Sequence, residues 1–306
     1  MLQERIEGKW ISSFRRVFVL NGIGKGTTVA LISETQSRPV LAHLSELALY
    51  DLGADFCILK MPTPPQTAPV PVKGTGTSLS IQHNRAIIEA MKKCEIVVDC
   101  TVEGMIHSPE WPEIEAAGTR ILVVTNEHPE ILERTEPFAE LGPKIDLGVQ
   151  MLTEAREMRV TSEAGTDLIV DLIDAPCGGT PGFGTNPGHV AHWPGGLCLA
   201  FPGKGCVNGR IVMGLGDMNL TFKTYLTSQI DFTVENDYVT SIKGDGIDAE
   251  HFRSYMEAWE DTEAYGFSHV GWGMNPRARW VSGALYDLSL IHISAPTSLG
   301  MISSDV

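Results

Sequence analysis

The sequence predicts an α/β N-terminal domain with a mainly parallel sheet, followed by an α+β C-terminal domain with mainly antiparallel strands. Two observations predict this. In the first half, short apolar runs alternate with segments of helical periodicity, which is typical of parallel βαβ units. In the second half, strand-like segments follow one another with turns between them, which favours antiparallel pairing. The length of 306 residues fits two domains.

The first domain is expected to cover residues 1–153. Short apolar runs bounded by turn residues predict buried strands, at 28–33, 55–59, 95–100 and 120–125. Apolar residues at helical spacing predict helices, at 39–52, 79–93 and 111–117. Gly53 follows the first helix as a candidate C-cap. The Pro-, Thr- and Gly-rich stretch 62–76 is expected to form a surface loop.

The second domain is expected to cover residues 154–287. Successive strands are predicted at 158–163, 167–172, 197–201, 209–214, 229–235 and 238–243. One helix is predicted at 249–259. The last stretch, 288–306, has Asp305 as its one charged residue, although a fifth of the whole chain is charged. We therefore expect it to be a non-native tail, joined to a gene truncated near residue 287.

The composition excludes several classes of partner. The chain has 23 Lys and Arg against 38 Asp and Glu, a formal net charge of −15, so we expect neither nucleic acid nor an anionic membrane as a partner. No segment reaches the ~18 consecutive apolar residues of a membrane span, and the N-terminus lacks the apolar core of a signal peptide. The six cysteines contain no CxxC pair and favour free thiols in a cytoplasmic protein. We also expect a homo-oligomer.

The stretch 174–196 is unusual, because it holds seven glycines, four prolines, two histidines and a tryptophan. A loop of this length inside a domain is usually functional or disordered, and we favour function. His189 and His192 lie three residues apart in it, and imidazoles suit proton transfer or metal ligation. The alternative is that both are merely hydrogen-bonded.

Two other features need separate interpretations. The run Gly22-Ile23-Gly24-Lys25-Gly26 does not match the GxxxxGK[ST] phosphate loop, and it precedes a strand, so we interpret it as a tight turn. His107 follows the strand that ends at Cys100, and ligands of open α/β sheets bind beyond the carboxyl ends of the strands. The alternative for this region is a loop that caps a helix through Ser108 and Pro109.

The segment 265–277 combines glycines, aromatic residues, a histidine and an arginine. Its three glycines allow the backbone to approach a ligand closely. His269 would be presented among aromatic side chains, and Arg277 could pair with a carboxylate or a substrate oxygen. This segment is therefore a candidate site.

Four motifs together resemble a known family: His107-Ser108-Pro109-Glu110, His192-Trp193-Pro194, Gly216-Asp217 and the long run YGFSHVGWGMNPRARW at 265–280. They are similar to the 2,5-dihydroxypyridine 5,6-dioxygenases, which open a pyridine ring in nicotinate degradation. The resemblance runs from about residue 25 to Asp287. It also implies a distant relationship to the thermophilic aminopeptidases, metallopeptidases with a similar two-domain layout.

The resemblance implies an Fe(II)-dependent extradiol-type reaction of a small aromatic N-heterocycle with O₂, giving N-formylmaleamate. Iron would be held by two histidines and an aspartate, which leaves open positions for substrate and O₂. His269 matches the first histidine ligand. The other two belong to a His-x-Asp motif that is expected beyond residue 306, and we find no copy of it in the chain.

The resemblance also assigns roles to the other candidates. His192 or His189 would be the catalytic base, and His107 would hydrogen-bond the substrate. Trp193 and Trp272 would pack against the pyridine ring of the substrate, and Arg277 would also contact the substrate.

Two alternatives remain open. One is an aminopeptidase-like metallohydrolase, but Leu197 and His269 stand where those relatives would have metal-binding glutamates, which weakens a two-zinc interpretation. The other is an inactive truncated homologue, and for a chain without the His-x-Asp motif we expect weak or no activity.

Overall fold

The computed structural model describes residues 5–65, 69, 78–219, 222, 224–279, 293–294 and 301–302. The chain divides into two compact units. Unit 1 comprises residues 1–66, 73–142 and 180–196, and unit 2 comprises 67–72, 143–179 and 197–306. This division differs from the predicted domains 1–153 and 154–287, because the units part at 142/143 and residues 180–196 return to unit 1.

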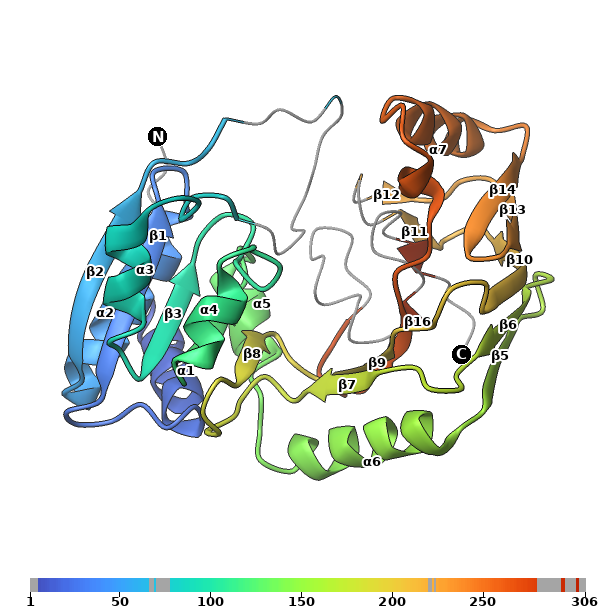
Figure 1. The fold of residues 1–306 in the computed structure, drawn as a ribbon. Coiled ribbons are helices and arrows are strands. Elements are labelled where there is room, and N and C mark those ends of the chain that lie inside the picture. Colours follow the sequence, from blue (N-terminus) through green and yellow to red (C-terminus); the bar gives the residue numbers. More distant parts are fainter. Residues whose placement is uncertain are drawn as a thin grey trace. The chain divides into compact units, whose positions relative to one another are not determined.

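Unit 1 is built on a five-stranded parallel sheet, as the sequence predicts (Figure 1). Its strands, in sheet order, are β2 (Asp55–Met61), β1 (Thr28–Glu34), β3 (Ile96–Cys100), β4 (Arg120–Val124) and β8 (Val190–Trp193). Every residue of β3 and β4 is buried. This burial explains why these strands are largely apolar in the sequence, since helices cover both faces of a parallel sheet.

Each face of this sheet has its own apolar core. Helices α1 (Gly8–Leu20) and α2 (Pro39–Leu52) contribute to one core, and α3 (Arg85–Met91) and α4 (Trp111–Ala116) contribute to the other. A further short helix, α5 (Pro129–Arg134), follows β4. The core on the α3 and α4 side includes Val97 and Val123 of the sheet and Met105 of the loop after β3.

The turns and helix ends of unit 1 agree with the sequence predictions at some positions and differ at others. Gly53 caps α2 in the left-handed conformation, with φ 67°, as expected. Gly22 and Gly26 also have positive φ and lie in turns before β1, as the interpretation of this run as a tight turn predicts. The helix predicted from residue 79 begins only at Arg85, because Asn84 is its N-cap and accepts a hydrogen bond from the Ile87 N–H at 3.3 Å. Most of the predicted loop 62–76 lies outside the described residues.

The stretch 174–196 is not a single loop, contrary to the prediction. It contains β7 (Cys177–Thr180) and β8, and β8 pairs in parallel with β4 at the edge of the sheet of unit 1. Close backbone approach explains part of its glycine content, since a Cβ on Gly195 would lie 2.2 Å from the nitrogen of Gly182. The glycines and prolines therefore shape an ordered strand connection.

Unit 2 contains two antiparallel sheets, as the prediction of an α+β domain requires. One has the order β14 (Tyr238–Lys243), β13 (Ile230–Glu235), β10 (Val207–Met213), β6 (Asp167–Asp171) and β5 (Glu157–Thr161). The other has the order β12 (Thr224–Tyr225), β11 (Met218–Asn219), β17 (Met301–Ile302), β16 (Ile293–Ser294), β15 (Val270–Gly273), β9 (Leu197–Ala200) and β7.

The helices of unit 2 are α6 (Leu141–Glu154), α7 (Ile247–Glu257) and the short 3-10 helix η1 (Thr262–Tyr265). Phe232 of β13 and Phe252 of α7 meet in its core, with ring centroids 5.3 Å apart. Apart from 293–294 and 301–302, the predicted tail 288–306 lies outside the described residues. No helix in the described part of the chain has the length and apolar character needed to cross a membrane.

Candidate active site

Two of the predicted site residues, His107 and His192, both lie at the carboxyl edge of the sheet of unit 1. His192 lies in β8 beside Val123 of β4, and Val123 lies beside Asp99 of β3. Neighbours in a parallel register point to the same face of a sheet. This is the face covered by α3 and α4, because Val123 belongs to that core. His107 follows β3 in the chain, in a loop beyond the carboxyl end of that strand, and its charge contributes to the lowered pKa of His192.

The imidazole of His192 has a defined hydrogen bond. Its Nδ1 lies 2.6 Å from the carbonyl oxygen of Pro194, two residues along the chain. Burial lowers the pKa of His192 to about 4, the bond to Pro194 opposes this, and the charge of His107 adds to the lowering. His192 is therefore a neutral imidazole at physiological pH.

His107 lies in the loop that joins β3 to α4. Its side chain keeps an exposed surface, but the protein around it still lowers its pKa through burial. It is therefore also biased toward the neutral form. Two imidazoles at one sheet edge, each with a lowered pKa, can exchange protons with a bound ligand or hydrogen-bond it.

His189 does not join this pair. It precedes β8 and lies at the amino edge of the sheet, where its carbonyl accepts a hydrogen bond from the Ile121 N–H at 2.9 Å. Three residues along a strand separate it from His192 by about 10 Å. Burial lowers the pKa of His189, a bond to the Phe183 backbone opposes this, and the charge of Arg120 adds to the lowering. Ligands of such sheets bind at the carboxyl edge, so we do not keep His189 as a candidate base.

Trp193 is a core residue, contrary to its predicted role at the substrate. Its side chain is 0% exposed, and the centroid of its ring lies 4.7 Å from the ring centroid of Phe14. Its Nε1–H donates a hydrogen bond to the carbonyl of Leu132 at 2.9 Å. Successive residues of a strand point to opposite faces, so His192 and Trp193 cannot line one site. The tryptophan instead fills the core between the sheet and α1.

The remaining predicted residues belong to unit 2 and lie in one segment around β15. His269 precedes β15 and is partly buried, its Nδ1 lies 3.0 Å from the Ser268 hydroxyl, and its ring centroid lies 5.6 Å from that of Phe201. Trp272 is partly buried and packs against the core of unit 2. Arg277 is exposed, and its backbone N–H donates to Asn275 Oδ1 at 3.0 Å.

The described residues do not assemble the metal site that the resemblance implies. Among them, no group of three or more His, Cys, Asp or Glu side chains is placed to hold a metal ion. Position 197 offers no ligand either, because Leu197 is an apolar side chain that is 7% exposed in β9. The two-histidine, one-aspartate set is therefore not present in the described part of the chain.

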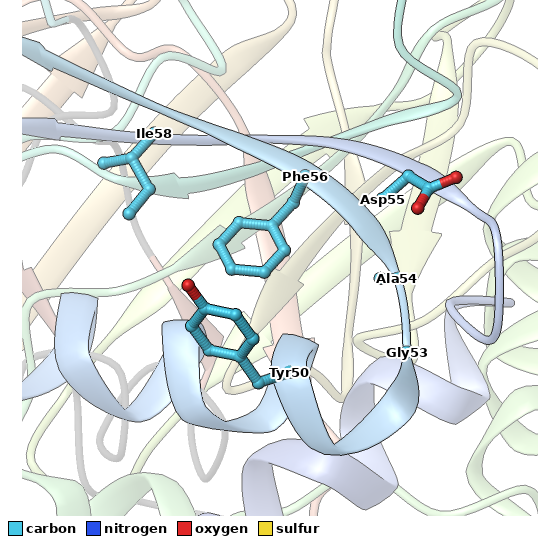
Figure 2. Close-up of a pocket in the computed structure, with 6 residues that line it drawn as sticks. All are labelled: Tyr50, Gly53, Ala54, Asp55, Phe56 and Ile58. Atoms are coloured by element: carbon cyan, nitrogen blue, oxygen red, sulfur yellow. The ribbon is translucent and has the colours of Figure 1, made fainter.

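A pocket at one edge of unit 1 lies apart from the histidines. Figure 2 shows the residues that line it, at the end of α2 and the start of β2: Tyr50, Gly53, Ala54, Asp55, Phe56 and Ile58. The rings of Tyr50 and Phe56 meet edge to face, 4.9 Å apart. None of the predicted site residues lines this pocket, so it carries no part of the proposed chemistry.

Asp99 is a residue of this region that the sequence interpretation missed. It is the one charged residue in the otherwise apolar β3 and is 0% exposed. Burial raises its pKa to about 6, although hydrogen bonds from Thr101 and Met105 oppose the shift. A carboxylate at the end of a buried strand is the signal that could have identified it.

Comparisons with known proteins decide the family. A family model for 2,5-dihydroxypyridine 5,6-dioxygenase matches residues 9–298. The chain belongs to the 2,5-dihydroxypyridine 5,6-dioxygenase family. The match reaches residue 298, whereas the sequence motifs led us to expect that similarity would stop at Asp287.

Relatives of known sequence and structure agree with this family. A 2,5-dihydroxypyridine 5,6-dioxygenase from Pseudomonas putida is 31% identical over 276 residues, which are 90% of this chain and 78% of the relative. The solved structure of 2,5-dihydroxypyridine dioxygenase from P. putida superposes with a TM-score of 0.83 at 30% identity, covering 89% of this chain and 78% of that one. Membership of this dioxygenase family makes the chain an enzyme of this type.

A more distant likeness concerns the fold alone. The structure of wild-type AmpT from Thermus thermophilus has a TM-score of 0.60 at 13% identity, covering 97% of this chain and 87% of that one. The expected distant relationship to an aminopeptidase is thus found at the level of architecture. AmpT and this chain therefore share a fold.

Proposed function

We propose that this chain opens the ring of 2,5-dihydroxypyridine with O₂ to give N-formylmaleamate, an extradiol-type step of nicotinate degradation. Family membership supports the reaction class. The observation that carries the proposal is the neutral, partly buried His192 at the carboxyl edge of the sheet, where α/β enzymes bind ligands, with His107 in a loop at the same edge.

His192 is the candidate general base. A carbonyl oxygen can only accept a hydrogen bond, so the short contact to Pro194 requires the proton to be on Nδ1. The lone pair of the neutral ring is then on Nε2. This nitrogen is the one that would take the proton of a ring hydroxyl, a transfer that typically contributes about 10²–10⁴-fold to a rate.

Other residues would bind the substrate. His107 would hydrogen-bond the ring, since it lies at the same edge of the sheet as His192 and burial lowers its pKa. Trp272 and Arg277 remain proposed substrate contacts from unit 2. His189 and Trp193 are left out, because one lies at the other sheet edge and the other lies in the core.

Fe(II) is the proposed cofactor, with His269 as one ligand. When bound, iron would offer neighbouring positions for the substrate and O₂. The described residues do not form the complete ligand set, so the roles above concern proton transfer and substrate binding by the chain alone. We also propose a homo-oligomer and a cytoplasmic location; the location is supported by six cysteines without a disulfide.

The test is oxygen uptake after anaerobic incubation of the purified chain with Fe(II). Because the described residues lack the complete ligand set, we expect weak O₂ consumption, which requires 2,5-dihydroxypyridine and is lost in a His269→Ala variant. Release of p-nitroaniline from leucine p-nitroanilide, dependent on a divalent metal and independent of O₂, would instead favour a hydrolase. Normal turnover by the His269→Ala variant would remove the ligand assignment.

A further inference from the structure

The loop that carries His107 has no regular secondary structure, so side-chain bonds must define its course. It runs from Thr101 to Ser108, between β3 and α4. Met105, in its middle, is 0% exposed and belongs to the core under α3 and α4. The loop is therefore anchored on one side by an apolar contact, and polar contacts complete its attachment.

Asp99 binds this loop at two separated points. Its Oδ1 accepts hydrogen bonds from the Thr101 N–H at 2.8 Å and from the Thr101 hydroxyl at 2.7 Å. Its Oδ2 accepts a hydrogen bond from the Met105 N–H at 2.8 Å. One carboxylate thus spans five residues of the loop and closes it into a turn that ends two residues before His107.

A second set of bonds holds the far side of the same loop. The Ser78 N–H donates to the carbonyl of Gly104 at 2.6 Å, and the Ser108 hydroxyl donates to the carbonyl of Ser78 at 2.6 Å. Ser78 is itself fixed, because its hydroxyl donates to Glu34 Oε1 at the end of β1. His107 therefore lies between two attached points, Met105 and Ser108.

Burying Asp99 is costly, which argues that its bonds have a purpose. A buried carboxylate loses its hydration, and burial raises the pKa of Asp99 to about 6. An apolar residue at this place in the core would avoid that cost. Both carboxylate oxygens accept N–H bonds from the loop, which an apolar side chain cannot do.

We propose that Asp99 is a positioning residue, which holds the 101–108 loop and so fixes the place of His107 at the carboxyl edge of the sheet. The consequence for turnover rests on the proposed function, because there His107 binds the substrate. Asp99 acts through the main chain and not through its charge, since burial alone accounts for the lowered pKa of His107.

The decisive experiment is an NMR titration of the histidine Cε1–H signals in the wild type and in Asp99→Asn. An asparagine keeps an oxygen for Thr101 but presents its NH₂ group to the Met105 N–H, so that bond is lost. The loosened loop should expose His107 further, and its pKa should rise toward the ordinary value of an imidazole. A control, Thr119→Val, removes hydroxyl bonds to the carbonyls of Met91 and Cys94 at the opposite sheet edge and should leave His107 unchanged.

The direction in which the pKa of His107 changes distinguishes an effect of the loop from an effect of the Asp99 charge. A fall in the pKa of His107 in Asp99→Asn would mean that the charge of Asp99 acts directly, and no change would mean that the loop does not depend on Asp99. Either result overturns the proposal. If Asp99→Asn does not fold, Ser108→Ala removes the second attachment and should raise the pKa of His107 in the same direction.

Steady-state kinetics with 2,5-dihydroxypyridine then test the link to function. A misplaced His107 should lower kcat/KM about 10- to 100-fold, mainly through a higher KM. A variant that only unfolds more easily, as expected for Thr119→Val, should lose apparent kcat at constant KM. No oxygen uptake by the wild type would overturn the proposed function, while the titration of His107 would still decide the role of Asp99.

Discussion

The Nδ1 atom of His192 lies 2.6 Å from the carbonyl oxygen of Pro194. Pro194 is the last residue of the His192-Trp193-Pro194 motif. This contact fixes the tautomer of the imidazole, because the carbonyl can only accept a hydrogen bond. It also fixes the ring orientation at the carboxyl edge of the sheet. The same motif therefore contains both the candidate base and the group that orients it.

Replacement of His192 should affect catalysis far more than replacement of His189. We expect His192→Gln to lower kcat about 10²–10⁴-fold, because the base is lost. His189→Gln is the matched control, three positions away on the same chain segment but at the other edge of the sheet. Oxygen uptake with 2,5-dihydroxypyridine measures both variants, and equal losses of kcat would contradict the assignment.

His192 should remain neutral well below the pH at which an ordinary histidine is protonated. Its pKa is about 4 in the folded protein against 6.5 for an unperturbed imidazole. The unfolded chain therefore takes up this proton first as the pH falls, and stability is lost from about pH 6.5 down to pH 4. The loss from this group is at most about 3 kcal/mol. Urea unfolding of the wild type and of His192→Gln across this pH range measures this loss. If the free energies of unfolding of the two proteins changed in parallel with pH, the lowered pKa of His192 would be contradicted.

Asp99 should have the opposite pH dependence. Its pKa is raised from 3.8 to about 6 by burial, so its contribution to stability is complete below pH 3.8 and is lost as the pH rises through 6. The free energy of unfolding of Asp99→Asn should therefore improve relative to the wild type between pH 4 and pH 7, by up to about 3 kcal/mol. Denaturation curves of the two proteins, measured at each pH, test this. A free energy of unfolding of Asp99→Asn that falls relative to the wild type between pH 4 and pH 7 would refute it.

Trp193 should matter for stability and not for substrate binding. Trp193→Ala should lower the free energy of unfolding by about 3–5 kcal/mol, because it leaves a cavity against Phe14 in the core. The milder Trp193→Phe should keep the wild-type KM for 2,5-dihydroxypyridine. Urea denaturation and steady-state kinetics measure the two effects. A large rise in KM for Trp193→Phe would restore its predicted role at the ring.

The strands that the sequence predicted well are those with a strong local signal. β1 and β4 are continuous apolar runs, because central strands of a parallel sheet are buried on both faces. β8 has only four residues among glycines and prolines, and its strand character comes from pairing with β4. Its local sequence could not reveal that long-range contact. The helix α1 was also not expected from the sequence.

The site was predictable in kind but not in geometry. The spacing of His189 and His192 suggested one cluster, but in an extended strand three residues separate the two imidazoles by about 10 Å. Successive side chains of a strand also point to opposite faces of the sheet. His192 and Trp193 therefore lie on different faces, although the sequence motif led us to place both at the substrate. Asp99 was missed because its role depends on a loop whose course is set by tertiary contacts with Met105 and Ser78.

The fate of ¹⁸O₂ tests the central claim most directly. The purified chain, loaded with Fe(II) without oxygen, is mixed with 2,5-dihydroxypyridine and ¹⁸O₂, and the product is analysed by mass spectrometry. A ring-cleaving dioxygenase that uses His192 as its base predicts both labelled oxygen atoms in N-formylmaleamate, and little product from His192→Gln. A ring-opened product without label, or equal labelled product from His192→Gln, would contradict the account.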